Sequence, residues 1–207
     1  MALVDLPVRA LLGRFSSSDP TPGGGSASAL SSATGASLLM MVASLPKTRS
    51  GTDEDRAALA AAAAELPAIR DRLAAAVDED TAAYDAVVAA YKLPKGSPDE
   101  QAARKAAIQR ALGLATEVPL GVVRLSADAL GRAAAIAAHG HRGAASDVGV
   151  AVALLRAGAE GARLNVEINV GSLADAAYAE RVRRDCAAAS QASTSAADEA
   201  DRLLRAG

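Results

Sequence analysis

The chain has 207 residues, of which 51% are hydrophobic but only 2% aromatic, and its formal net charge is −2. This length suffices for one domain with a buried core. Because Lys and Arg are spread along the chain with little aromatic residue between them, a nucleic-acid partner is disfavoured. The single cysteine, Cys186, has no partner for an internal disulfide, which favours the reducing cytoplasm.

Membrane insertion is also disfavoured by the sequence. The N-terminal segment 1–15 interrupts its apolar run with Asp5, Pro7 and Arg9, so it lacks the core of a signal peptide. No stretch approaches the roughly 20 uninterrupted apolar residues that a membrane span needs. We therefore expect a cytoplasmic protein with no membrane contact.

Alanine, the best helix former, dominates the composition, whereas Val, Ile and aromatic residues are too scattered for a sheet. The predicted helices cover, in chain order, about 3–15, 26–45, 53–93, 99–138, 144–170 and 173–204. Pro67 and Pro119 fall inside two of them and predict kinks. Short linkers favour antiparallel neighbours. We predict an all-α fold: an up-and-down bundle of long, Pro-kinked helices, forming one domain over 1–207.

One helix has an acidic residue on its apolar stripe. The stripe consists of Leu66, Ile69, Leu73, Val77, Tyr84, Val88 and Tyr91, at the spacing of an amphipathic helix. Asp80 lies on this stripe where a core residue is expected. Either Asp80 is a buried carboxylate held by an Arg or a helix N-terminus, or its carboxyl has a raised pKa that suits an acid or base.

A second helix carries polar residues on one face. Asp147 shares this face with Ala151, Leu154 and Gly158, and the same face extends to Asn165 and Asn169. Asn is at best neutral inside a helix, so these two side chains need partners. Their partners are either neighbouring helices or a ligand rich in donors and acceptors.

A glycine-rich loop precedes the helix predicted over 26–45. Gly23, Gly24 and Gly25 lead to Ser26, a candidate N-cap. Unpaired N–H groups and the helix dipole favour an anion at such a helix start, although the loop matches neither the dinucleotide fingerprint nor the P-loop. The alternative is a tight turn followed by a helix whose small residues let another helix approach closely.

The segment "PTPGGGSASALSSATGASLLMMVASL" (20–45) resembles the opening motif of the cyclodeaminase/cyclohydrolase family, which includes the C-terminal domain of formiminotransferase-cyclodeaminase. The resemblance continues in "VDEDTAAYDAVVAAYKLPKGSPDE" (77–100), "ATEVPL" (115–120), "SDVGVAVALL" (146–155) and "NVEINVGSLAD" (165–175). It covers nearly the whole chain, and the combination of motifs is more specific than any one of them.

The resemblance implies a helical homodimer that binds a tetrahydrofolate derivative in a cleft and needs no metal or organic cofactor. Asp80 and Asp147 are then the predicted proton-transferring and cation-facing carboxyl groups, in either order. The predicted substrate contacts at the cleft are Gly23, Gly24, Gly25, Ser26 and Tyr84. Asn165 and Asn169 would hold the edges of the pterin ring or orient the attacking group, and Lys47 and Lys95 would meet the carboxylates of the glutamate tail. His139 and His141 lie outside the matched motifs and are read as loop residues.

Within the family, the main prediction is formimidoyltetrahydrofolate cyclodeaminase, which converts 5-formimino-tetrahydrofolate to 5,10-methenyl-tetrahydrofolate and ammonia. The alternative is methenyltetrahydrofolate cyclohydrolase, which opens the methenyl ring with water. A helical scaffold without chemistry is a further alternative. A metal-binding bundle ranks last, because the sequence lacks the Glu-x-x-His pairs of di-iron bundles.

Overall fold

The computed structural model describes residues 1–206, and the regular elements in this range are all helices. The main helices are α1 (Val8–Phe15), α2 (Gly24–Ala43), α3 (Asp53–Ala63), α4 (Leu66–Tyr91), α5 (Pro98–His139), α6 (Ala145–Val170) and α7 (Ala176–Ala206). Two short 3-10 turns, η1 (Leu3–Asp5) and η2 (Arg142–Ala144), complete the set. The prediction of an all-α fold is confirmed.

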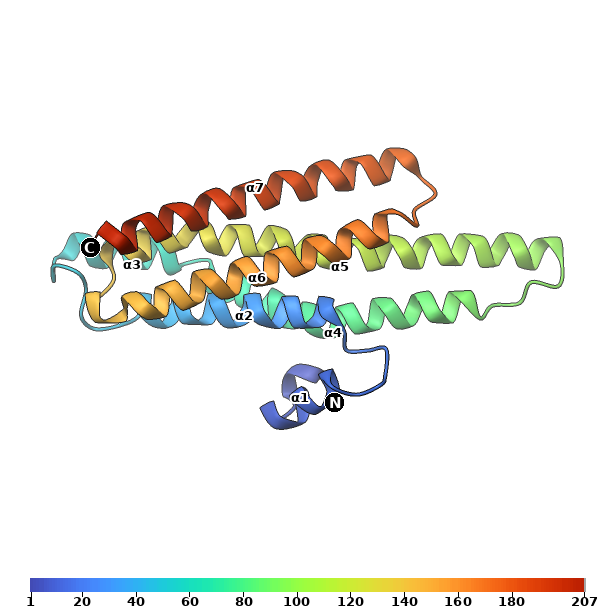
Figure 1. Cartoon of the computed structure of the whole chain (residues 1–207), viewed down its shortest axis with the longest axis horizontal. Helices are drawn as coiled ribbons and strands as arrows, with labels where there is room; N and C mark the ends of the chain where they lie inside the picture. The colour runs from blue at the N-terminus through green and yellow to red at the C-terminus, as the bar shows by residue number, and fades with distance from the viewer. Residues whose placement is uncertain (207) are drawn as a thin grey trace.

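The five long helices lie along the long axis of the molecule (Figure 1). Successive long helices alternate in direction, and the hairpin of α4 and α5 extends past the others at one end. The C-terminus, α3 and the start of α6 lie at the opposite end. Helix α2 packs mainly against α6 and α4, while α5 packs against α7, α6 and α4.

Two predicted helices are divided in the structure. Pro7 precedes α1 and separates it from η1. The predicted helix over 53–93 is wrong as a single kinked element, because α3 ends at Ala63 and α4 begins at Leu66. Pro67 therefore lies in the first turn of α4, where its missing N–H costs no helical hydrogen bond. Pro119 lies inside the uninterrupted α5.

Helix α2 has few large side chains because α6 approaches it very closely. A Cβ added to Gly158 would lie 2.0 Å from Ser32 Oγ and 2.6 Å from the Ser28 carbonyl oxygen. Serines on α2 supply the polar ties between helices. The Ser31 hydroxyl donates to the Leu154 carbonyl at 2.8 Å, and the Ser32 and Ser126 hydroxyls lie 2.7 Å apart. The alternative reading of this segment, small residues for close helix packing, is confirmed.

Helix α2 also corrects the expectation about membrane-length segments. It has 20 residues, and an 18-residue window within it has a mean hydropathy of 1.3, so it is long and apolar enough by length and composition to cross a membrane. The sequence criterion missed it because glycine, alanine and serine interrupt the run of large apolar residues. Half of the apolar window is buried inside the bundle, as in a core helix.

The core consists of one large cluster and one small one. The large cluster joins residues of α2, α4, α5, α6 and α7, including the fully buried Leu39, Leu73, Leu130 and Leu155. The small cluster lies in the α4–α5 hairpin and consists of Ala90, Ile108, Ala111 and Leu112. Val87 packs against this small cluster, and both Val87 and Leu112 also border the pocket described next.

Candidate functional site

A pocket of about 330 Å³ opens where the N-terminus of α2 meets the middle of α4 and the second half of α6. Its volume lies within the range of small-molecule sites. The predicted site residues that line it are Gly23, Gly24, Asp80, Tyr84, Asn165 and Asn169. The remaining lining residues are Pro20, Thr21, Val87, Leu112 and Ala115. The pocket therefore brings together residues separated by up to 149 positions in the sequence.

Asp80 caps helix α2 from the neighbouring helix α4. Its Oδ2 accepts a hydrogen bond from the Ser26 backbone N–H at 2.8 Å and lies 3.0 Å from the Ser26 hydroxyl. The N-cap residue of α2 is Gly23, which has no side chain for this purpose. The prediction that Ser26 is the N-cap is thus wrong: Ser26 lies in the first turn, and the carboxylate of Asp80 satisfies its N–H.

Gly25 makes this contact possible. A Cβ at position 25 would lie 2.1 Å from Asp80 Oδ1, 2.5 Å from Cγ and 2.7 Å from Oδ2. Asp80 therefore occupies the space that any other residue's side chain would need. At Gly24, by contrast, a Cβ would meet only Asn165 Nδ2, at 3.8 Å, which is ordinary van der Waals contact.

Burial raises the pKa of the Asp80 carboxyl above its ordinary value, and the side-chain and backbone hydrogen bonds from Ser26 oppose this rise. Desolvation disfavours the charged form, whereas donors aimed at the carboxylate favour it. The residues that line the pocket include no Lys or Arg, so no lining cation offsets the desolvation. Both readings of Asp80 are combined here: a helix N-terminus holds the carboxylate, and its pKa is raised.

Ser26 and Gly25 support the pocket without lining it. The Ser26 side chain is completely buried, and its hydroxyl lies 2.8 Å from the Val77 carbonyl oxygen and 3.3 Å from Thr81 Oγ1. Gly25 is also buried, beneath the Asp80 carboxylate. Neither residue lines the pocket, so their direct contact with a ligand stays a prediction.

The two asparagines present their side-chain oxygens as acceptors. Asn165 Nδ2 donates to the Gly161 carbonyl at 2.8 Å, one turn back along α6. Asn169 Nδ2 donates to the Ala115 carbonyl at 2.7 Å and so ties α6 to α5. Each bond uses one of the two N–H donors of its amide, so each side chain retains one donor and its Oδ1 acceptor for a ligand. Tyr84, one turn beyond Asp80 on α4, is 42% exposed at the mouth of the pocket.

Besides Gly25 and Ser26, three further predicted residues do not line this pocket. Asp147 is in the first turn of α6, 18 residues before Asn165, or about 27 Å along the helix axis. Lys47 lies beyond the C-terminal end of α2, about 30 Å from the glycines at its start. Lys95 is exposed in the loop between α4 and α5. Within one chain, the prediction that Asp147 and Lys47 share a site with Asp80 is wrong.

Five lining residues of the pocket were not predicted: three apolar residues and two that come before the glycine loop. Val87, Leu112 and Ala115 have the pattern of ordinary core residues, so no sequence signal separates them from the core. Thr21 and Pro20 directly precede the glycine loop, and their position beside it was an available signal. The structure places them at the rim of the pocket.

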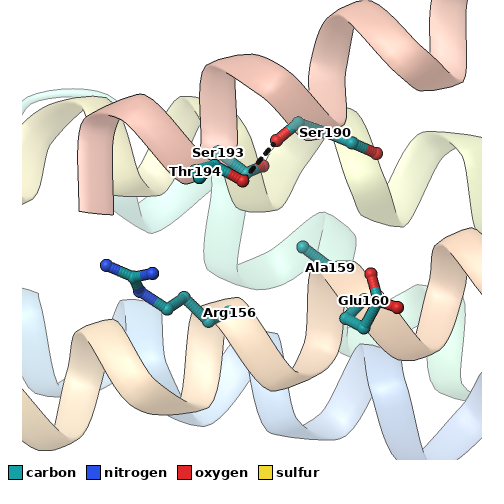
Figure 2. A pocket seen from close by; sticks show the side chains of 6 residues that line it. All are labelled: Arg156, Ala159, Glu160, Ser190, Ser193 and Thr194. Carbon is teal, nitrogen blue, oxygen red and sulfur yellow. Dashed lines mark hydrogen bonds between the residues drawn. The ribbon is translucent and has the colours of Figure 1, made fainter. Parts of the chain in front are cut away.

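A second hollow, of about 210 Å³, lies between α6 and α7 (Figure 2). It is lined by Arg156, Ala159, Glu160, Ser190, Ser193 and Thr194. Arg156 donates to Asp198 at 2.7 Å and to Asp201 at 2.9 Å, so its charge is already balanced. This hollow is smaller than typical ligand sites. Its one carboxyl group, Glu160, is exposed and not half-buried like Asp80. Among residues 1–206, no cluster of three His, Cys, Asp or Glu side chains is arranged to hold a metal ion.

Comparisons with known proteins agree with the resemblance noted in the sequence. A methenyltetrahydrofolate cyclohydrolase from Methylorubrum extorquens is 40% identical over 134 residues, which are 65% of this chain and 64% of that protein. Rat formimidoyltransferase-cyclodeaminase is 34% identical over 119 residues, 58% of this chain. The match spans only 22% of the rat protein, so the chain corresponds to a minor part of that longer protein.

The fold also has a close counterpart among solved structures. The crystal structure of formiminotetrahydrofolate cyclodeaminase from Thermotoga maritima matches with a TM-score of 0.86 at 23% identity, covering 98% of this chain and 97% of that one. At this identity the likeness establishes the fold. The family model described as formiminotransferase-cyclodeaminase matches residues 7–188, which is most of the chain. The chain therefore belongs to the formiminotransferase-cyclodeaminase family.

Proposed function

We propose that this protein is a folate one-carbon enzyme that acts on the carbon bridging N5 and N10 of tetrahydrofolate in the Asp80 pocket. The observation that carries this proposal is the half-buried carboxyl of Asp80, whose pKa is raised in a pocket lined by no Lys or Arg. A 5,10-methenyl group carries a delocalised positive charge. It would supply the countercharge that the pocket lacks, as expected of a site complementary to developing charge.

Two reactions fit this arrangement, and both pass through a tetrahedral carbon between N5 and N10. In the cyclodeaminase reaction, N10 attacks the formimino carbon and loses a proton, and ammonia leaves after protonation. In the cyclohydrolase reaction, water attacks the methenyl carbon and loses a proton, the bond from carbon to N5 breaks, and N5 takes up a proton. Asp80 is the proposed proton acceptor and donor, and Asn165 and Asn169 orient the pterin through its N–H groups.

The comparisons support both reactions. The cyclodeaminase reading follows from the motifs, and the matched part of the rat bifunctional protein supports it. The cyclohydrolase reading is supported by the higher identity to the Methylorubrum enzyme and by the more even coverage of the two chains. Purified protein assayed with each substrate separates them: ammonia release from 5-formimino-tetrahydrofolate indicates the first reaction, and loss of methenyl absorbance above the spontaneous rate indicates the second.

The role of Asp80 is tested by Asp80→Asn, which keeps the size of the side chain and an oxygen acceptor but removes the titratable charge. Loss of general acid–base catalysis predicts a decrease of about 10²- to 10⁴-fold in kcat/KM, with an unchanged circular dichroism spectrum. The matched control is Asp85→Asn, because Asp85 is exposed on the same helix. Normal turnover in the Asp80 variant, or equal losses in both variants, would contradict the assignment.

We further propose that the protein is a homodimer formed through α6. Val150, Leu164 and Ile168 are 51%, 48% and 75% exposed. Together with the exposed Ala157 they form a stripe along one face of α6, because positions 150, 157, 164 and 168 are seven, seven and four residues apart. Such a stripe fits an isologous contact with a second copy. Sedimentation should show a dimer for the natural chain and a monomer for Ile168→Glu. A monomeric natural chain at micromolar concentration would refute this contact.

A further inference from the structure

The end of the bundle opposite the Asp80 pocket has a hollow of about 400 Å³ bordered by cations. It lies between the loop that follows α2 and the turn before α6, beside α3, at the end where the C-terminus lies (Figure 1). Four permanently charged side chains line it: Lys47, Arg49, Arg56 and Arg142. Pro46, Thr48, Ser50, Gly51 and His141 complete the lining. We call it the basic hollow.

The four cations of the basic hollow have no carboxylate among the residues that line it. None of these four cations forms an ion pair within residues 1–206. This concentration of positive charge occurs in a chain whose net charge is −2. Like charges gathered around one concave surface repel each other, so the arrangement favours an anion from solution.

The loop of the basic hollow is fixed by a buried carboxylate. Asp55, only 4% exposed, accepts hydrogen bonds from the Ser50 N–H at 2.6 Å, the Ser50 hydroxyl at 2.7 Å and the Thr48 hydroxyl at 3.1 Å. Its other oxygen lies 2.8 Å from His139 Nδ1. Asp55 therefore holds the loop in shape, and it forms no ion pair with any of the four cations.

Further backbone contacts join the two walls of the basic hollow. The Arg49 N–H donates to the His139 carbonyl at 2.8 Å, and Thr48 forms an isolated antiparallel bridge with Gly140. Arg56 Nη2 donates to the Pro46 carbonyl at 2.9 Å, which keeps its guanidinium beside the loop. A rigid loop that presents several cations binds an anion without a large ordering cost.

We propose that the basic hollow binds a small multivalent oxyanion, a phosphoryl or carboxylate compound, at a site separate from the Asp80 pocket. Guanidinium groups bind both kinds of oxyanion through paired hydrogen bonds, and Lys47 adds a point charge. Four cations with no lining carboxylate match a ligand with more than one negative group.

The test is calorimetric titration of the whole chain at low ionic strength with two probes, inorganic pyrophosphate and citrate. Three proteins are compared: the natural chain, the double variant Arg49→Gln/Arg142→Gln, and Arg184→Gln. Arg184 is exposed on α7, remote from the hollow, and serves as the control for loss of a surface charge. Circular dichroism checks that each variant is folded.

We expect at least one probe to bind the natural chain and Arg184→Gln equally, and to bind the double variant at least about tenfold more weakly. Binding of pyrophosphate alone identifies a phosphoryl ligand, and binding of citrate alone a carboxylate ligand. Absence of binding by both probes, or equal binding by the double variant, overturns the proposal. Displacement of the bound probe by tetrahydrofolate would overturn the separateness of the site, while leaving folate binding itself intact.

Discussion

Replacing Gly25 with alanine tests the contact between Asp80 and the start of α2 directly. The new methyl group would lie 2.1 Å from Asp80 Oδ1 and within 2.7 Å of the other two carboxylate atoms. Because ordinary contacts begin near about 3.4 Å, the carboxylate has to move by about 1 Å or more. This movement breaks the bonds from the Ser26 N–H at 2.8 Å and from the Ser26 hydroxyl at 3.0 Å.

The magnitude follows from these two bonds. A hydrogen bond to a charged group contributes about 1.5–3 kcal/mol, and water in the pocket would restore part of that to the displaced carboxylate. We therefore expect Gly25→Ala to lower the free energy of unfolding by about 2–4 kcal/mol. Gly24→Ala is the matched control, since its methyl group would meet only Asn165 Nδ2, at 3.8 Å. This control should be neutral or stabilising by up to about 1 kcal/mol.

The assay is urea unfolding at neutral pH, followed by circular dichroism, in a double-mutant cycle with Asp80→Ala. Without the carboxylate, the methyl group of Gly25→Ala has room, so its cost should fall close to zero. The coupling energy between the two sites is then about 2–4 kcal/mol. If Gly25→Ala costs as much in the Asp80→Ala background as in the natural chain, or no more than Gly24→Ala, the contact does not hold the two helices as described.

Three further outcomes follow from the structure. Ser26→Ala removes a hydrogen bond that opposes the rise in the pKa of Asp80, so the acid limb of a kcat/KM profile should move to higher pH; an unchanged or lower limb would contradict this. Gly158→Ala places a methyl group 2.0 Å from a serine hydroxyl of α2, so it should lower the free energy of unfolding in urea by about 1–3 kcal/mol or more. Gly113→Ala, with open space around it, should leave this free energy unchanged. Hydrogen bonds from His139 and Ser50 hold the pKa of Asp55 well below its usual range, so Asp55 stabilises the fold above the unfolded-state pKa and loses this effect as pH falls toward its folded-state pKa. The stability difference between the natural chain and Asp55→Asn should therefore shrink below about pH 4, and a difference independent of pH would refute this role.

The sequence was informative where a local pattern was broken by a single residue. Asp80 was found because it interrupts an apolar stripe, and that stripe faces the core in α4, where Leu73 and Val77 are fully buried. Its partner was not predictable in the same way. The bond from Ser26 to Asp80 joins residues 54 positions apart, and no periodicity within one helix shows which helix start will lie against it.

The error over Asp147 has a similar cause. Helical periodicity shows which residues share a face but contains no information on distance along the axis. Asp147 and Asn165 do lie on one helix, yet at 1.5 Å per residue they are about 27 Å apart. The basic hollow was not predicted because Lys47, Arg56 and Arg142 are far apart in the sequence. They come together only when two loops pair.

The contact between Asp80 and α2 links the stability of the fold to the proposed chemistry. The N–H of Ser26 and the dipole of α2 favour the charged carboxylate, whereas burial favours the protonated acid. The net effect raises the pKa of Asp80 above its ordinary value, which suits a group that must both take up and release a proton. A cationic folate carbon beside Asp80 would favour the carboxylate, and departure of that charge on ring opening would favour the acid. The same helix start that holds Asp80 in place therefore keeps its proton exchangeable during the proposed reaction.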